Sequence, residues 1–279
     1  MSALMPLESL YEAQRGPDVP LPPELGALYG RLQFPAHPGR PHVIGNVVTT
    51  LDGVVALATP GRTGGGEISG FNPHDRMVMG LLRAVADAVV VGAGTLRAVP
   101  KHLWTAARIY PALADAYQSL RIALGKPEPP LTVVVTASGE LDLDLPVFQS
   151  GKVPALIATT TNGAQRLHGR GLPPLVQIAG LQSSGRLSAR AILEAVSAVR
   201  PSEIILVEGG PRLMGDFLAE RRLDELFLTL APQVAGRDHA HERPGLVAGH
   251  RFAPERPLWG TIVGVKRAGS HLFLRYAFG

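Results

Sequence analysis

The sequence predicts an α/β protein built on a mixed, mostly parallel sheet whose C-terminal end is antiparallel. Short apolar runs typical of buried strands alternate with helical segments between residues 43 and 222, and this alternation indicates parallel βα units. From residue 226 onward, three strand-like segments follow one another with no helical pattern between them, which favours antiparallel pairing. The two patterns together predict one α/β domain.

An extension is predicted ahead of this domain. Residues 1–40 are rich in proline, and Leu25, Tyr29 and Leu32 recur at the spacing of one helix face. These features predict a single short helix that packs on the main domain. The main domain is then expected to cover residues 41–279.

The main domain begins with an apolar run at residues 43–48, which predicts a buried strand. A loop is expected at residues 49–53, and the apolar residues 54–56 are expected to resume as a strand. Residues 61–70 contain five glycines and predict a loop long enough to cover a ligand. An ordinary surface loop explains the same composition.

The first long helix is predicted to begin at Asn72. Asparagine is a good capping residue, Pro73 suits the first helical position and Asp75 suits the first turn. Apolar periodicity and turn residues indicate the remaining elements. Strands are predicted at residues 88–91, 131–135, 155–158, 204–207, 226–230, 261–265 and 272–276, and helices at residues 111–124, 188–199 and 213–222.

Composition excludes several classes of protein. There is no cysteine, which removes disulfides, thiolate zinc sites and cysteine nucleophiles. The formal net charge is +4, but the basic residues are scattered and only 5% of residues are aromatic, so we expect no nucleic-acid partner. No apolar run approaches the roughly 20 residues of a membrane span, and no signal-peptide pattern opens the chain. We therefore expect a cytoplasmic protein without a membrane partner.

The histidines of a late charged loop, His239, His241 and His250, are the candidates for a metal site. No carboxylate–histidine helix motif accompanies them, so we expect no metal.

A strand that runs into Glu208-Gly209-Gly210-Pro211 is the strongest chemical signal in the chain. Two glycines let a backbone approach a bulky ligand, and the helix that follows directs unpaired N–H groups and a positive dipole end at that position. Phosphate is the usual ligand of such a site. A plain turn between a strand and a helix remains the alternative reading of the same residues.

A second glycine pair, Gly92 and Gly94, follows the predicted strand at residues 88–91 and precedes Thr95. Ligands of open α/β sheets bind beyond the carboxyl ends of the strands, so this segment is a candidate for cofactor contact. The dinucleotide fingerprint is incomplete because Arg97 stands where its third glycine would be. Arg97 is either a phosphate contact or a solvated side chain.

Three further residues are weaker candidates. Asp52 lies in an Asp-Gly turn, which is common without any function. Arg83 could bind a substrate phosphate, but a positive charge near a helix end is also favourable by itself. Ser138 lacks the Gly-x-Ser-x-Gly elbow of a serine hydrolase.

Taken in order, these segments resemble a known family. The chain is similar, over about residues 41–277, to the reductase domain of the riboflavin-biosynthesis deaminase/reductase. The matching segments are Thr50-Leu51-Asp52-Gly53, Leu82-Arg83-Ala84, Asp87 to Thr95, Val207 to Pro211, Leu223 to Leu226 and Ala231 to Gly236.

The resemblance implies a dihydrofolate-reductase-like three-layer fold and an NADPH-dependent reductase that works as a homodimer on a small molecule. In the riboflavin enzyme, the ribose of a ribosylamino-pyrimidine phosphate is reduced to ribitol. Carried onto matching positions, the resemblance places Arg83 and Glu208 at the substrate and Asp52 at the floor of the site, with Glu208 and Asp52 as catalytic candidates. Together with the glycine patterns, it implies these NADPH contacts: Gly92, Gly94, Thr95, Arg97, Ser138, Gly209, Gly210, Pro211, Arg212 and Leu213.

The chain also departs from the family pattern. An aspartate that helps bind NADPH in the riboflavin enzymes is replaced by Val99, and residues 105–126 resemble an insertion near the substrate. The zinc motif of the deaminase half needs cysteines that this chain lacks. We therefore expect an NADPH-dependent reductase of a small heterocyclic or sugar-phosphate substrate. The alternative, which Val99 motivates, is a nucleotide- or flavin-binding protein of the same fold without turnover.

Overall fold

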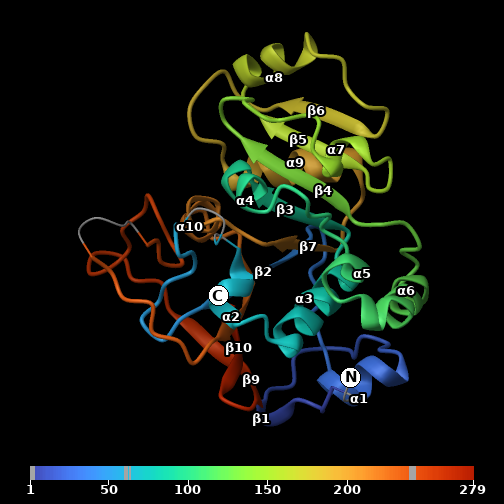
Figure 1. Cartoon of the computed structure of the whole chain (residues 1–279), viewed down its shortest axis with the longest axis vertical. Helices are drawn as coiled ribbons and strands as arrows, with labels where there is room; N and C mark the ends of the chain where they lie inside the picture. Colours follow the sequence, from blue (N-terminus) through green and yellow to red (C-terminus); the bar gives the residue numbers. More distant parts are fainter. Residues whose placement is uncertain (1–3, 60–61, 63, 239–242) are drawn as a thin grey trace.

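The computed structural model describes residues 4–59, 62, 64–238 and 243–279, and within them a ten-stranded sheet forms the centre of the molecule (Figure 1). Across the sheet the strands follow the order β1-β9-β10-β8-β2-β7-β3-β4-β5-β6. Their bounds are β1 Glu8–Glu12, β2 His42–Thr49, β3 Ala88–Gly92, β4 Leu131–Thr136, β5 Ala155–Thr159, β6 Val176–Gly180, β7 Ile204–Val207, β8 Glu225–Leu230, β9 Gly260–Ala268 and β10 His271–Phe278.

The sheet divides into a parallel and an antiparallel part. From β8 through β2, β7, β3, β4 and β5 to β6, every neighbouring pair is parallel. The strands β1, β9, β10 and β8 pair antiparallel. The predicted α/β class, with a mostly parallel sheet and an antiparallel C-terminal end, is confirmed.

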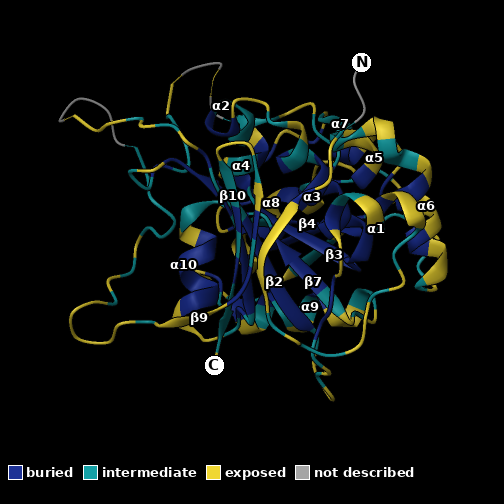
Figure 2. Ribbon diagram, turned by 90° about the horizontal axis from the view of Figure 1, so that it is seen from below, coloured by how far each residue is buried: buried dark blue, intermediate teal, exposed yellow. Residues whose placement is uncertain are grey.

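Helices cover both faces of the sheet, so that its central strands are buried (Figure 2). One face packs against residues of α1, α3 and α6, and the other against α9 and α10. The helices are α1 Pro23–Tyr29, α2 Gly65–Ser69, α3 Pro73–Val85, α4 Ala93–Ala98, α5 Ala106–Ile109, α6 Ala114–Ala123, α7 Pro146–Gln149, α8 Thr161–His168, α9 Ala189–Val199 and α10 Pro211–Ala219, with a 3₁₀ turn at Pro111–Leu113.

The continuous apolar runs form the central strands because both of their faces are buried. Along β3, Val89 and Val91 join the core cluster that contains Tyr117 of α6, whereas Val90 joins the cluster that contains Phe217 of α10. Successive side chains of a strand point to opposite faces, so one run of valines contributes to both cores.

The predicted start of α3 is confirmed. The Oδ1 atom of Asn72 accepts hydrogen bonds from the backbone N–H groups of His74 at 2.8 Å and Asp75 at 3.2 Å, and Pro73 occupies the first turn. The helix ends with Arg83 in its last turn.

Two predictions about residues 50–70 are wrong. Residues 54–56 form no strand, because the N–H of Thr50 donates to the carbonyl of Val54 and the N–H of Val54 donates back to Thr50 Oγ1. This closed turn leaves no extended backbone for pairing. Part of the glycine-rich segment predicted as a loop forms the short helix α2, and the Phe71 ring lies over Gly66, where an added Cβ would approach it to 2.9 Å.

The N-terminal segment contains the predicted helix, α1, whose Leu25 and Tyr29 are buried in the core. It also contributes β1, which the sequence did not reveal because all five residues of this edge strand are exposed. The division at residue 40 stays a prediction. In the described part of the chain, no helix has the length and apolar character needed to cross a membrane.

Arg121 of α6 ties the end of α3 in place. Its Nη1 donates to the carbonyls of Ala84 and Ala86 at 2.9 Å each, its Nε donates to the carbonyl of Glu128 at 3.0 Å, and burial lowers the pKa of Arg121 to about 10.

We expect Arg121→Met to lower the free energy of unfolding by about 2–4 kcal/mol, because buried carbonyls lose their donors. Chemical denaturation measures this loss. The matched control, Arg190→Met, removes an exposed pair with Glu194 and should cost less than about 0.5 kcal/mol; equal losses would contradict the assignment.

Candidate active site

A cavity of about 1630 Å³ lies beyond the carboxyl ends of the parallel strands β2, β7, β3, β4 and β5. Open α/β sheets bind their ligands at this edge. Sites for a single small molecule usually measure roughly 300–1,000 Å³, so this cavity has room for a dinucleotide-sized ligand and a second molecule beside it.

Two glycine turns form the middle of the cavity wall. Gly92 and Gly94 come from the β3–α4 junction, and Gly209 and Gly210 come from the β7–α10 junction. The N–H of Gly92 donates to the carbonyl of Gly209 at 2.8 Å, which holds the turns side by side. An added Cβ at Gly94 would meet no atom within 4 Å. The absent side chain at Gly94 therefore leaves open space at the cavity wall.

Thr95 lies beside these turns, since a Cβ built on Gly210 would approach its Oγ1 to 3.4 Å. Pro211, Arg212 and Leu213, in the first turn of α10, also line the cavity. Gly210 caps α10 without a side chain, so the first N–H groups of this helix receive no side-chain cap from it. Such a helix start favours an anionic ligand.

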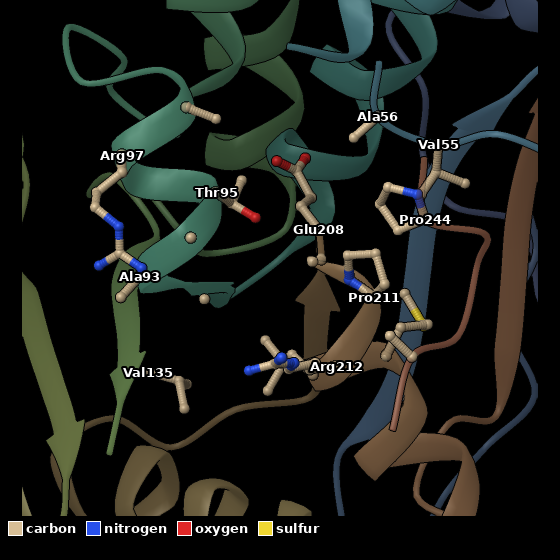
Figure 3. A pocket seen from close by; sticks show the side chains of 18 of the residues that line it. Val55, Ala56, Ala93, Thr95, Arg97, Val135, Glu208, Pro211, Arg212 and Pro244 are labelled. Carbon is tan, nitrogen blue, oxygen red and sulfur yellow. The ribbon is translucent and has the colours of Figure 1, made fainter. Parts of the chain in front are cut away.

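The cavity has two halves that differ in chemistry. The arginine half is formed by residues of β4, the β5–α8 junction, residues 184–187, Arg97 and the start of α10. The apolar half is formed by residues of β2, residues 55–71, α3 and residues 99–109. In Figure 3, Arg97 and Val135 lie on one side of Glu208, and Val55, Ala56 and Pro244 lie on the other.

Arg97 and Arg212 are exposed at the cavity, and no described residue forms an ion pair with either of them. Arg166, Arg186 and Ser138 line the same half. Ser138 Oγ accepts from the backbone N–H of Glu140 at 3.1 Å. Arg166 pairs with Glu140 and Arg186 with Asp216. The free guanidinium groups of Arg97 and Arg212 suit phosphate, which arginine binds in a bidentate manner.

Glu208 lies between the two halves and is held by Arg83. Arg83 Nε donates to Glu208 Oε1 at 2.8 Å, and Arg83 Nη2 donates to Oε2 at 2.7 Å. The two side chains are 2% and 6% exposed. The structure thus brings these predicted residues together, and the bidentate pair fixes the orientation of the Glu208 carboxylate.

His102 completes this buried network. Arg83 Nη1 donates to His102 Nε2 at 2.7 Å and to the carbonyl of Thr105 at 3.3 Å. Burial, together with the nearby Arg83 guanidinium, lowers the pKa of His102 to about 3. His102 is therefore neutral at physiological pH and serves as an acceptor for Arg83.

Asp52 does not belong to the cavity lining. Its Oδ1 accepts from Thr50 Oγ1 at 2.5 Å and from the N–H of Ala235 at 3.1 Å, and its Oδ2 accepts from the N–H of Gly236 at 2.8 Å. The structure thus places Asp52 at the junction of two loops, and a part in the reaction stays a prediction.

The hydrogen bonds from Thr50 and from Ala235 lower the pKa of Asp52 to about 2 from an ordinary value of 3.8. A carboxyl whose pKa is depressed on folding stabilises the protein above its unfolded-state pKa and loses this effect as pH falls through the folded-state pKa. We expect Asp52→Asn to lower Tm at pH 6, with the difference from the unmodified chain shrinking between pH 4 and pH 2. Thermal unfolding across this range measures it, and a difference independent of pH would contradict the assignment.

Sequence patterns missed part of the cavity. Thr160 and Asn162 lie at the β5–α8 junction, and Arg166 follows on α8, a helix that was not predicted. Thr160 Oγ1 accepts from the N–H of Gly163 at 3.0 Å and caps this helix. The available signal was Thr160, a capping residue directly after β5.

The histidine candidates were His239, His241 and His250; the first two lie outside the described residues. His250 Nε2 lies 2.9 Å from Asp216 Oδ1.

Elsewhere among the described residues, His37, His42 and Asp224 form one group with metal-ligand atoms close together. Asp224 there accepts two hydrogen bonds from Arg40, at 2.6 and 2.8 Å, and this pair accounts for its position.

Comparison with known proteins shows which family the chain belongs to. The model of the RibD C-terminal domain family matches residues 41–252. The riboflavin biosynthesis protein RibD of Aquifex aeolicus is 25% identical over 199 residues, which cover 71% of this chain and 48% of that protein. The chain therefore spans about half the length of this curated relative.

Solved structures show the same fold. A pyrimidine reductase-like protein of Corynebacterium diphtheriae superposes with a TM-score of 0.64 and 21% identity, over 86% of this chain and 92% of that one. The riboflavin biosynthesis reductase Rib7 of Saccharomyces cerevisiae has a TM-score of 0.57 and 13% identity, over 88% and 92% of the two chains. The dihydrofolate-reductase-like designation stays a prediction, and the chain belongs to the RibD C-terminal domain family.

Proposed function

We propose that this protein is an NADPH-dependent reductase of a small heterocyclic or sugar-phosphate substrate. The observation that carries the proposal is the cavity itself, in which an arginine-lined half with two glycine turns adjoins a fixed buried carboxylate, Glu208. Family membership supports the same reaction class.

The residues of the arginine half fit a phosphorylated dinucleotide. The open space beside Gly94 admits a bulky ligand, and the start of α10 with Arg97 and Arg212 would hold its phosphates. Arginines at such a site also suit the additional 2′-phosphate of NADPH. Thr95 and Ser138 would contribute hydroxyl groups to the same ligand.

NADPH held by the arginine half would supply the hydride for reduction of a carbonyl or imine carbon, and the proton that completes the reduction would come from solvent. The chain's own residues orient the reactants. Glu208 accepts hydrogen bonds from substrate donors, since each of its oxygens keeps acceptor capacity beside Arg83. Arg83 is a positioning residue that keeps this carboxylate in one orientation, and the apolar walls reduce access of water.

A test of this function follows the loss of reduced nicotinamide absorbance over a panel of heterocyclic carbonyl and imine compounds. We expect turnover with at least one of them by the unmodified chain and its loss in Glu208→Gln. NADPH binding without turnover over the whole panel would favour the second candidate, a nucleotide-binding protein without turnover. Val99 favours that candidate, because it presents an apolar side chain beside Gly64 in the cavity wall.

By the same resemblance, we propose a cytoplasmic homodimer. Sedimentation of the purified chain of 29.5 kDa measures its mass in solution. A species of twice the chain mass is expected, and a monomer at micromolar concentration would contradict dimerisation.

A further inference from the structure

We propose that His37, His42 and Asp224 bind one zinc ion that fastens the N-terminal segment to the sheet. Within residues 4–59, 62, 64–238 and 243–279, these three side chains form the one group whose metal-ligand atoms all lie within 4.8 Å of one another. The site lies away from the cavity, and the inference does not depend on the proposed reductase function.

The three residues come from separate parts of the chain that meet at one end of the sheet. His37 lies in the loop that leads into β2, His42 is the first residue of β2, and Asp224 directly precedes β8, which pairs with β2. Val47 and Val48 line the cavity toward the other end of β2. A metal ion held here would therefore link the segment before residue 41 to two strands of the sheet, and its role would be structural.

The histidine nitrogens carry the proposal. His42 is 3% exposed, and neither of its ring nitrogens has a hydrogen-bond partner in the described part of the chain. The buried Nε2 atom of His37 has none there either. Buried polar atoms are unfavourable without a partner, so such atoms in a folded protein indicate a bound group. Imidazole nitrogens are the commonest metal ligands, and one zinc ion would bind a nitrogen of each ring.

The carboxylates around His42 give its two nitrogens different roles. Nδ1 lies 3.7 Å from Asp224 Oδ2, and Nε2 lies 3.7 Å from Glu225 Oε1. Nδ1 therefore faces the ligand oxygen of Asp224, while Nε2 faces a second carboxylate to which it can donate. Metal-bound histidines usually donate their other ring N–H to such a carboxylate. Glu225 is itself fixed, since Arg275 Nε donates to its Oε2 at 2.6 Å.

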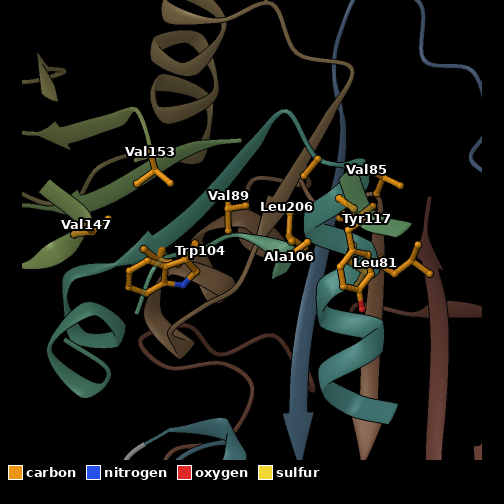
Figure 4. Close-up of a cluster of buried hydrophobic side chains, with 14 of the residues drawn as sticks. Leu81, Val85, Val89, Trp104, Ala106, Tyr117, Val147, Val153 and Leu206 are labelled. Carbon is orange, nitrogen blue, oxygen red and sulfur yellow. The ribbon is translucent and has the colours of Figure 1, made fainter. Parts of the chain in front are cut away.

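The groups are close enough to bind zinc after a small movement. Zinc bonds of roughly 2.0–2.2 Å put tetrahedral ligand atoms roughly 3.4 Å apart, so a pair at the 4.8 Å limit must close by about 1.4 Å. His42 is fixed, because its ring centroid lies 5.4 Å from that of Phe34, which belongs to the core cluster that contains Val89 and Tyr117 (Figure 4). The movement falls to the loop residue His37, which is partly buried and lies 4.3 Å from His42 between ring centroids. Water would complete the coordination.

Arg40 competes with a metal ion for Asp224. Its guanidinium donates to Asp224 Oδ2 at 2.8 Å and to Oδ1 at 2.6 Å, and its charge repels a cation. The Arg40 side chain is 45% exposed, so it can move into solvent when zinc binds. The backbone N–H of Val43 also donates to Asp224 Oδ2, at 2.8 Å, and keeps the carboxylate in place. Removal of Arg40 should therefore strengthen zinc binding.

Calorimetric titration of the untagged full-length chain with ZnCl₂ at about pH 7.5, after removal of metal with a chelator, tests the proposal. We expect one Zn²⁺ per chain with a Kd on the order of 1 μM. The Kd should rise at least about tenfold in His37→Gln and in His42→Gln, and fall at least about threefold in Arg40→Met. His168→Gln is the matched control, because His168 is exposed on α8, and it should bind zinc as the unmodified chain does.

Thermal unfolding provides the second measurement. Saturating zinc should raise the Tm of the unmodified chain and leave that of His37→Gln nearly unchanged, because only an ion bound to the folded state stabilises it. His37→Gln changes a loop residue and keeps the test valid even if His42→Gln does not fold. No zinc binding by the folded, unmodified chain would overturn the proposal. Equal zinc affinity in His37→Gln and the unmodified chain would also overturn it, since the ion would then lie elsewhere.

Discussion

The substitution Glu208→Gln is expected to lower kcat by about 100-fold or more while leaving the Kd for NADPH within about threefold of its original value. Glutamine keeps the size of the side chain but removes its charge and turns one acceptor oxygen into an N–H₂ donor that faces Arg83. The bidentate pair at 2.7 and 2.8 Å is lost, and with it the fixed acceptor for substrate. Steady-state kinetics and calorimetry measure the two effects separately.

Glu67→Gln is the matched control for this prediction. Glu67 lines the same half of the cavity, but no described arginine forms an ion pair with it. Its loss should change kcat by less than about tenfold. Equal losses of turnover and NADPH affinity in Glu208→Gln would instead place Glu208 in the cofactor site.

The second large effect is expected at Gly94. Replacing it with valine adds a side chain in a direction where no protein atom lies within 4 Å, so the fold accepts the change and the cavity loses space. We expect NADPH affinity to fall by at least about 100-fold, because a bulky group then occupies the wall that the cofactor must approach. Fluorescence titration with NADPH measures the loss.

Gly26→Val provides the comparison for stability. Gly26 is also a helical glycine, in α1, and an added Cβ there meets no atom within 4 Å. Both variants should unfold within about 1 kcal/mol of the unmodified chain, and Gly26→Val should bind NADPH normally. If Gly94→Val kept full affinity for NADPH, the cofactor would not lie against this turn.

The sequence predicted the central strands and the glycine turns because their signals are local. A fully buried strand such as β3 is a continuous apolar run, and the glycines that follow it mark the point where the backbone turns. The start of α3 was predictable for the same reason, since Asn72 and Pro73 act within one turn of helix.

Other features depend on contacts between distant residues. Arg83 and Glu208 are 125 positions apart, and no pattern around either one shows that they bind each other. The resemblance implies that both residues contact the substrate, whereas in the structure Arg83 donates its hydrogen bonds to Glu208. Edge strands were missed because few of their side chains are buried: β1 has no buried residue, and β6 has only Val176. They are held by pairing with β9 and β5, which local sequence does not encode.

The strand predicted at residues 54–56 was wrong for a related reason. Val54 is 0% exposed, as an apolar strand residue would be, but its burial comes from a turn that folds back onto Thr50. The apolar character of a residue predicts that it is buried but does not predict its backbone conformation. At Val54 that conformation depends on the hydrogen bond to the Thr50 hydroxyl.

A calorimetric titration of the purified full chain with NADPH, and separately with NADH, tests the central claim most directly. The proposed site predicts one NADPH per chain with a Kd on the order of 1 μM, and binding of NADH that is weaker by at least about tenfold because it lacks the phosphate that Arg97 or Arg212 would contact. No binding of either nucleotide by the folded chain would contradict the assignment of the arginine half as a cofactor site.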